Sequence, residues 1–208
     1  MTDNIIIYGN ITSSVIVIGC FHGDEPQGKY LIDEYIKINE DTNILFIPCL
    51  NKYGFEHNIR TNSNGVDLNR NFPTKNWELS SKQDNLFFGG TEPASEQETR
   101  FIIDIIENNN PKLILTLHAP YKVVNYDGDA KEISEKISEI IGYPVEESIG
   151  YPTPGSFGTW AGIERNIPVV TLELDEEVDV KELEKPVFEV FKLLENIAAN
   201  RENAKLRI

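Results

Sequence analysis

The chain has 208 residues, of which 40% are hydrophobic and 25% are charged. This composition is typical of a globular protein and excludes collagen-like or largely disordered chains, and the length predicts one domain, residues 1–208, with a full core. The 34 acidic residues exceed the 19 basic ones, for a formal net charge of −15, which disfavours binding to nucleic acids or anionic membranes.

Apolar runs of strand length alternate with amphipathic runs of helix length, which predicts an α/β layered fold. In chain order we expect strand 5–8, strand 15–20, helix 26–38, strand 44–48, helix 95–108, strand 113–118, strand 122–125, helix 130–141, helix 159–166, strand 169–174 and a helix from about residue 180. Pro26 suits the first turn of its helix, and Ser95 with Glu98 forms a capping-box pattern. Residues 51–93 are polar with little periodicity, and a stretch of this length usually carries function.

The N-terminus and the cysteines bear on the compartment. Residues 1–4, MTDN, lack the basic and apolar regions of a signal peptide. Cys20 and Cys49 each close an apolar run, and we expect free, buried thiols because cytosolic chains seldom keep disulfides. The sequence therefore predicts a cytoplasmic protein and leaves its oligomeric state open.

Residue types that commonly bind metals occur at the ends of two predicted strands. His22 and Glu25 follow the strand 15–20 on a turn that leads into a helix, and His118 ends the strand 113–118. The carboxyl ends of strands are where α/β sheets bind ligands, and zinc accepts mixed nitrogen and oxygen donors. Each feature alone also fits a structural residue, such as an acid that stabilises a helix N-terminus. Because two of only three histidines occupy such positions, a metal site is favoured.

The polar loop and the last strand supply further candidates. Residues 60–73, RTNSNGVDLNRNFP, contain two arginines among several amides, and arginine binds carboxylates through two parallel hydrogen bonds or stabilises an oxyanion. Glu173 interrupts the apolar run VVTLEL, where an acid near a metal could serve as a general base. A solvated loop and a strand-edge acid facing water are the other interpretations. We expect Asp67 to order the loop or to orient the metal ligands, without binding the metal itself.

Taken in this order, the motifs resemble the zinc carboxypeptidase superfamily. The resemblance runs from about residue 15 to residue 173 and includes FFGG (87–90), SEQET (95–99), TPGSFGTWAG (153–162) and IPVVTLEL (167–174). With HGDE (22–25) and GVDLNRNFP (65–73), these motifs look most like the small bacterial murein-peptide amidases. Such enzymes recycle wall peptides by cleaving the bond between γ-D-glutamate and meso-diaminopimelate. The resemblance implies a three-layer α/β/α sandwich around a mixed, mostly parallel sheet.

The resemblance also implies a role for each matched position. His22, Glu25 and His118 match the ligands of one zinc ion per chain, and Glu173 matches the general base. The partner implied is a small peptide substrate.

Four more positions match residues that contact the substrate. Arg60 matches the arginine that polarises the scissile carbonyl, and Asn69 and Arg70 match the pair that binds the free α-carboxylate. Tyr151 lies 22 residues before Glu173, as does the mobile tyrosine of digestive carboxypeptidases, although the prolines after it alter the loop.

Other functions remain open at this point. A deacylase of the succinylglutamate desuccinylase/aspartoacylase group would use the same zinc site on N-acyl amino acids, but that group usually lacks the GSFGTWAG and IPVVTLEL stretch. A conventional carboxypeptidase would release ordinary C-terminal residues and is usually larger. A binding module that kept the fold and lost the metal is the alternative outside enzymes, and zinc content would distinguish it.

Overall fold

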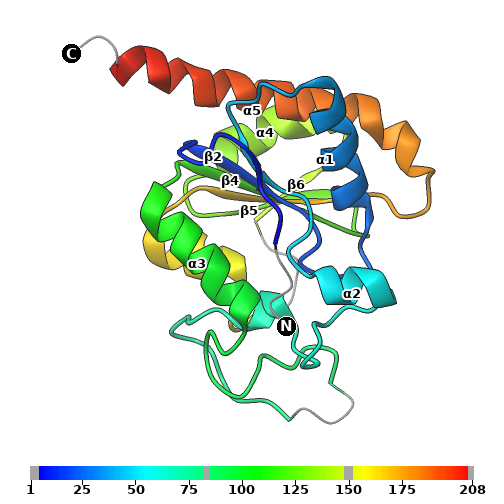
Figure 1. Ribbon diagram of the computed structural model, residues 1–208, viewed down its shortest axis with the longest axis vertical. Helices are drawn as coiled ribbons and strands as arrows, with labels where there is room; N and C mark the ends of the chain where they lie inside the picture. Colours follow the sequence, from blue (N-terminus) through cyan, green and yellow to red (C-terminus); the bar gives the residue numbers. More distant parts are fainter. Residues whose placement is uncertain (1–4, 82–84, 148–151, 206–208) are drawn as a thin grey trace.

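The computed structural model describes residues 5–81, 85–147 and 152–205. These residues fold around one central sheet (Figure 1). Seven strands are found in the described part of the chain, and they pair in the order β1-β3-β2-β4-β7-β5-β6. The strands are β1 (Tyr8–Gly9), β2 (Val15–Ile18), β3 (Leu45–Ile47), β4 (Leu113–His118), β5 (Val123–Asp127), β6 (Val145–Glu146) and β7 (Val169–Glu173). The helices are α1 (Gln27–Ile38), α2 (Lys52–His57), α3 (Gln97–Asn109), α4 (Lys131–Ile141) and α5 (Glu184–Lys205), with short helical turns η1 (Leu68–Arg70), η2 (Thr159–Ile163) and η3 (Val180–Leu183).

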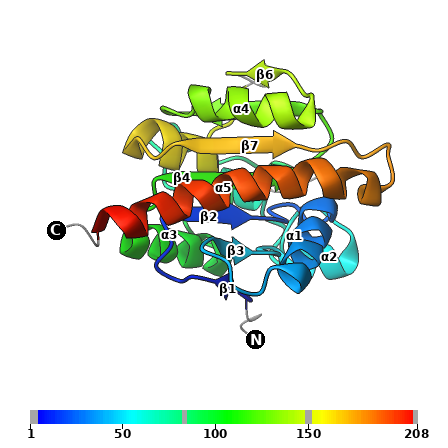
Figure 2. The same cartoon turned by 90° about the horizontal axis from the view of Figure 1, so that it is seen from above.

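The sheet is mixed and mostly parallel. β2 pairs in parallel with β3 and β4, β4 with β7, and β5 with β6. The antiparallel pairs are β1 with β3 and β5 with β7. Parallel strands need crossover connections, and helices supply most of them here (Figure 2). The predicted mixed sheet is confirmed.

Helices cover both faces of the sheet, which confirms the three predicted layers. Leu113, Leu115 and Leu117 of β4 belong to the core cluster shared with α1, α4 and α5. Ile114 of the same strand belongs to the second cluster, shared with α3 and η2. In Figures 1 and 2, α3 lies on the face of the sheet opposite α1, α4 and α5. Successive side chains of a strand point to opposite faces, so a strand covered on both sides must be apolar throughout.

Several element boundaries differ from those predicted from the sequence. The first strand is only Tyr8–Gly9, and Pro26 precedes α1 as its N-cap with φ −75°. The capping-box prediction is wrong: α3 begins at Gln97, and the Ser95 hydroxyl donates to Glu96 and accepts from the Asn71 amide. The helix predicted at 159–166 is helical from 157 to 165, with the π-helical turn η2 at its centre. The polar stretch 51–93 contains α2 and η1, and the two-residue β6 had no sequence signal.

Two other sequence predictions concern the thiols and the membrane. Cys20 and Cys49 are free, and the first is buried while the second is partly exposed. In the part of the chain that the structure describes, we find no helix with the length and apolar character needed to cross a bilayer.

The turn after β2 packs directly on α2. An added Cβ at Gly23 would lie 1.9 Å from the Gly54 carbonyl carbon and 2.2 Å from the Phe55 nitrogen. Both atoms are backbone and cannot rotate away, so this close approach requires glycine. It fixes the turn between His22 and Glu25 against the start of the polar loop.

We predict that Gly23→Ala destabilises the fold by at least about 2 kcal/mol, because the methyl group forces backbone apart. Gly142→Ala is the comparison, since an added Cβ there meets nothing within 4 Å and the only cost is its left-handed φ of +79°, about 1 kcal/mol for a residue with a Cβ. Chemical denaturation of both variants measures the difference. Equal midpoints would contradict the packing of this turn on α2.

Candidate active site

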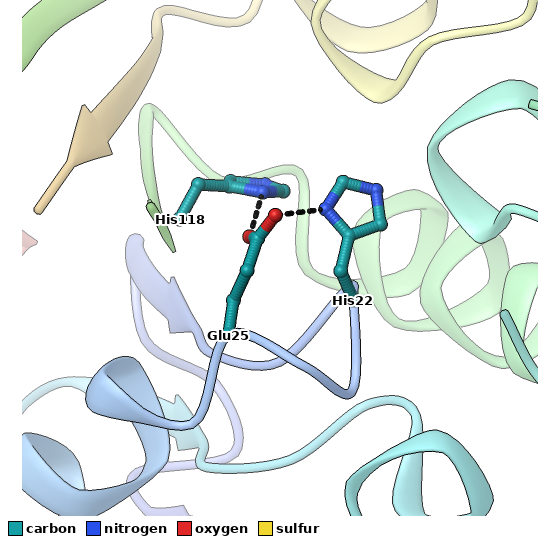
Figure 3. Close-up of side chains that lie close together, drawn as sticks. All are labelled: His22, Glu25 and His118. Carbon is teal, nitrogen blue, oxygen red and sulfur yellow. Dashed lines mark hydrogen bonds and ion pairs between the residues drawn. The ribbon is translucent and has the colours of Figure 1, made fainter. Parts of the chain in front are cut away.

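Two histidines and a glutamate converge at the carboxyl ends of β2 and β4. Nδ1 of His22 lies 2.7 Å from Oε1 of Glu25, and Nδ1 of His118 lies 2.9 Å from Oε2 of the same carboxylate (Figure 3). One donor atom from each residue lies within 4.8 Å of the others. Two imidazole nitrogens and a carboxylate are typical donors of catalytic zinc sites, which leave a fourth position open. This donor set therefore fits a zinc ion.

The local fold explains this convergence. β2 and β4 are parallel neighbours, so the residues after their carboxyl ends meet at one edge of the sheet. Glu25 lies just before α1 and also accepts a hydrogen bond from the Ala119 backbone nitrogen. The His118 ring stacks on Phe21, with centroids 5.4 Å apart, which restricts its orientation.

Asp67 connects the histidine turn to the polar loop. Its Oδ1 lies 3.0 Å from Nε2 of His22, and its Oδ2 accepts hydrogen bonds from Nε and Nη2 of Arg60 at 3.0 and 2.9 Å. Asp67 is fully buried. A carboxylate behind a ligating imidazole orients the ring and strengthens it as a ligand. Asp67 thus lies where the sequence predicted an orienting acid.

These contacts control the charges of the site. Burial alone lowers the pKa of His22, but the charges of Glu25 and Asp67 outweigh it and raise that pKa to about 9. Burial alone would raise the pKa of either carboxyl group, but the adjacent histidines, and Arg60 beside Asp67, hold both pKa values well below their usual range. Both carboxylates are therefore charged at neutral pH.

The polar loop is held in place by a buried acid at the start of α3. Oε2 of Glu96 accepts hydrogen bonds from the amides of Asn62 and Asn64, both at 2.7 Å. The Asp67 backbone nitrogen donates to the Phe88 carbonyl at 2.9 Å. Helical periodicity is weak in this loop because side chains, rather than helix or sheet ladders, satisfy much of its backbone.

Glu173 is the register partner of His118 on β7. It is 7% exposed, and its Oε2 has no hydrogen-bond partner among the described residues. Burial raises the pKa of Glu173, against the opposing effect of His118. An acid with a free, buried oxygen beside a cluster of metal-binding residues is well placed to accept a proton.

The two loop arginines flank a half-exposed aromatic ring. Nη1 of Arg60 lies 3.6 Å from Oε1 of Glu25, so this side chain borders the histidine cluster. The Phe87 ring centroid is 5.1 Å from Cζ of Arg60 and 5.5 Å from Cζ of Arg70. Arg70 and Phe87 line one cavity together with Tyr121 and Pro152. Sequence reasoning assigned no role to Phe87 or Tyr121, although FFGG was noted as a motif.

Asn69 and Tyr151 complete the predicted set. The Asn69 side-chain oxygen accepts a hydrogen bond from the Phe157 backbone nitrogen at 2.8 Å, which joins the polar loop to the TPGSF segment. Tyr151 lies outside the described residues. The structure thus brings the predicted residues at positions 22, 25, 60, 118 and 173 close together, with 69 and 70 on the adjoining loop.

The fold and this cluster define a class of protein, and comparison with known families agrees. The zinc carboxypeptidase family model matches residues 12–148, and the chain belongs to this family. The resemblance seen in the sequence motifs is therefore confirmed.

The curated relatives include murein peptide amidases. Murein peptide amidase A of Escherichia coli K12 is 32% identical over 158 residues, which cover 71% of this chain and 64% of that protein. The Vibrio campbellii enzyme of the same name is 29% identical over 177 residues, covering 80% of this chain and 66% of that one. The chain thus matches just under two thirds of the length of these relatives.

Solved structures give the same result for the fold. The murein-tripeptide amidase of Escherichia coli O157 superposes with a TM-score of 0.79 and 28% identity, covering 90% of this chain and 83% of that one. The carboxypeptidase A of Helicoverpa armigera has a TM-score of 0.68 at 19% identity, covering 92% of this chain and 61% of that chain, which supports the fold alone.

We predict that Asp67→Asn weakens zinc affinity by about 10- to 100-fold, because the orienting negative charge behind His22 is lost. Asp24→Asn is the matched control, because Asp24 lies in the same turn as His22 but is exposed. The zinc affinity of this variant should stay near that of the unmodified chain. Competition with a chromogenic chelator measures both. Equal affinity in the two variants would contradict the orienting role of Asp67.

Proposed function

We propose that this chain is a zinc-dependent amidase that hydrolyses a bond next to a free carboxylate, most simply the γ-D-Glu–meso-diaminopimelate bond of murein peptides. The observation that carries the proposal is the His22–Glu25–His118 cluster with Glu173 in register beside it. Its occurrence in a chain similar to murein peptide amidases over 71% of its length supports the substrate class.

His22, Glu25 and His118 would hold one zinc ion per chain. When bound, the ion supplies Lewis-acid chemistry, which lowers the pKa of water and withdraws charge from a carbonyl oxygen. The contact with Asp67 keeps the His22 ring oriented so that Nε2 faces Asp67 and Nδ1 faces Glu25.

Glu173 acts as the proton carrier of the reaction. Its unpartnered Oε2 accepts a proton from the attacking water and later returns it to the amine of the leaving residue. Burial favours the first step, because a raised pKa makes this carboxylate a stronger base. The second step remains favourable because the leaving amine is a much stronger base than a carboxylate.

The loop residues bind and orient the substrate. Arg60 stabilises negative charge that develops on the scissile carbonyl oxygen, and the Asp67 carboxylate fixes its guanidinium for that task. Asn69 and Arg70 bind the free α-carboxylate of the leaving residue, which selects substrates that end there. Tyr151 is assigned above the bound peptide on the sequence resemblance alone.

The biological setting follows from the same proposal. Residues 1–208 would form one catalytic domain that acts in the cytoplasm on small imported wall peptides during cell-wall recycling. The formal net charge of −15 disfavours nucleic acids and anionic membranes as partners.

We predict that Glu173→Gln lowers kcat by about 100- to 10,000-fold, the usual contribution of a general base, while zinc stays bound. Glu176→Gln is the matched control, since Glu176 is exposed three residues further along and should retain full activity. Rates and metal content are measured on the same preparations. Ordinary turnover by the Glu173→Gln variant would remove Glu173 from the mechanism.

We predict that the zinc-loaded chain releases diaminopimelate from L-Ala-γ-D-Glu-meso-diaminopimelate, and that a chelator abolishes the release. α-Linked peptides and N-acyl amino acids are assayed in parallel, with products identified by mass spectrometry. Preferential cleavage of α-linked peptides would indicate a general carboxypeptidase, and cleavage of acyl amino acids a deacylase. Failure on all three classes would contradict the proposed hydrolase.

A further inference from the structure

The chain has only two cysteines, and the fold places them side by side. Cys20 follows β2 and Cys49 follows β3, two strands that pair in parallel (Figure 2). Beyond the strand ends, the Gly19 nitrogen donates to the Ile47 carbonyl at 2.9 Å, and the Gly19 carbonyl accepts from the Leu50 nitrogen at 3.1 Å. Cys49 lies between these two partners of Gly19 in the chain, so it is held next to Cys20.

This arrangement has the spacing of a disulfide. Neighbouring strands lie about 4.8 Å apart, and the α-carbons of a disulfide lie about 4.4 to 6.8 Å apart. The two thiols also interact directly, because a hydrogen bond with Cys20 lowers the pKa of Cys49. Both cysteines are free thiols, and oxidation can join them with little movement of either strand.

Cys20 connects this pair to the proposed metal site. Its Sγ lies 3.6 Å from the Glu25 carbonyl oxygen, which is within the range of a hydrogen bond from sulfur. Its φ is 51°, a left-handed value that costs a residue with a Cβ about 1 to 2 kcal/mol. Strain of this kind persists where the surrounding structure holds it in place, and it is frequent at functional sites. The turn that carries His22 and Glu25 therefore begins at a strained residue whose thiol contacts a ligand residue.

Cys49 is the thiol that small molecules can reach. It lines a cavity of about 560 Å³ together with Lys29, whereas Cys20 is 0% exposed. The hydrogen bond with Cys20 lowers the pKa of Cys49 against the effect of burial, and the Lys29 ammonium group lowers it further, although Asp33 and Glu56 oppose that effect. The thiolate is the nucleophilic form of cysteine, so Cys49 is the more reactive of the two.

We propose that Cys49 is an oxidation site that a peroxide converts to a disulfide with Cys20, and that this disulfide weakens zinc binding by His22 and Glu25. The inference adds regulation to the proposed function, and its second half rests on that function. It also suits the cytoplasmic setting proposed above, where disulfides are rare unless they are transient and sense redox conditions.

The reaction uses the two thiols in turn. The Cys49 thiolate attacks one oxygen of hydrogen peroxide, the O–O bond breaks, and the second oxygen leaves as hydroxide, which takes up the thiol proton to become water. The Cys20 sulfur then attacks the resulting sulfenic acid, so that an S–S bond forms, the S–O bond breaks and a second water is released. The thiols lose two electrons to the peroxide, and exchange with glutathione reverses the reaction.

The disulfide would disturb the metal-binding turn in two ways. It removes the S–H group that donates to the Glu25 carbonyl, and it draws Cys20 toward Cys49. The turn has no room to adjust at Gly23, because this residue packs directly on the backbone of α2. The displacement therefore passes to the metal ligands on either side of Gly23.

The first measurement detects the disulfide itself. The reduced full-length chain is treated with hydrogen peroxide, blocked with iodoacetamide and digested with trypsin. Cys20 and Cys49 fall in different tryptic peptides, because Lys29 and Lys37 lie between them. We expect one joined species with the summed mass of the two peptides less two hydrogen atoms, and we expect glutathione to separate it. Two unjoined, blocked peptides after peroxide treatment would overturn the proposal.

The second measurement follows zinc affinity by competition with a chromogenic chelator. We expect the oxidised chain to bind zinc about 10-fold more weakly than the reduced chain, since groups that position metal ligands have effects of this size. Reduction with a phosphine should restore the affinity. Equal affinity of the cross-linked and reduced chains would overturn the effect on the metal site.

Cys49→Ala is the control variant, because Cys49 has no proposed part in catalysis or metal binding. It should bind zinc as the reduced unmodified chain does, and peroxide should leave that affinity unchanged. The chain has no further cysteine and only one methionine, Met1, so few other side chains react with peroxide. Weaker zinc binding by peroxide-treated Cys49→Ala would show damage elsewhere and overturn the role of Cys49.

The two proposals fail separately, because neither measurement uses turnover. A chain that binds zinc and cleaves no peptide would contradict the proposed hydrolase, while the cross-link and its effect on zinc affinity would still support the oxidation site. A chain that hydrolyses peptides equally well before and after complete cross-linking would contradict the regulation and leave the hydrolase in place.

Discussion

The site depends on the buried carboxylate of Asp67, which contacts both His22 and Arg60. Asp67 is fully buried, and a charge in that position is tolerated only when oppositely charged hydrogen-bond donors surround it. His22 supplies one donor and Arg60 supplies two. The histidine turn and the polar loop are separated in sequence, so this shared anion sets the position of both. It places the His22 imidazole and the Arg60 guanidinium near the same oxygen of Glu25, at 2.7 and 3.6 Å. The proposed metal ligand and the arginine proposed to face a substrate oxygen are thereby positioned together.

The second constraint comes from the sheet, because successive side chains of each strand point to opposite faces. One face carries core residues, and the other also carries residues proposed to act in the reaction. Residues 113, 115 and 117 of β4 pack against α1, α4 and α5, whereas 114 joins the cluster under α3 and η2. His118 and Glu173, the proposed metal ligand and general base, are register partners on the second face. A one-residue slip of β7 against β4 would move Glu173 to the first face. The apolar residues of both faces therefore hold the register between His118 and Glu173 as well as the fold.

The sequence predicted the central strands well because burial on both faces leaves near-continuous apolar runs, and 113–118 was predicted with both ends correct. It failed where contacts are distant in the chain. The Ser95 hydroxyl is engaged by Asn71 and Glu96, so it does not cap α3. β6 has two residues and little burial, hence no pattern. The positions of the metal-binding types could be predicted from strand ends, but Phe87 could not, because its role depends on two arginines that the fold brings to it.

The pairing of Asp127 with Gly158 shows why contacts between distant segments are hard to find from local sequence. At position 158 there is no side chain, which leaves no charge to interpret, and Asp127 by itself is an ordinary acid at the end of a strand. Their relation appears only when the segment around η2 lies on β5, so that the carboxylate fills the volume the glycine leaves. Because β5 is hydrogen-bonded to β7, the acid is held by the same rigid sheet as Glu173. The Asp127 carboxyl group therefore keeps a fixed separation from Glu173 along the sheet.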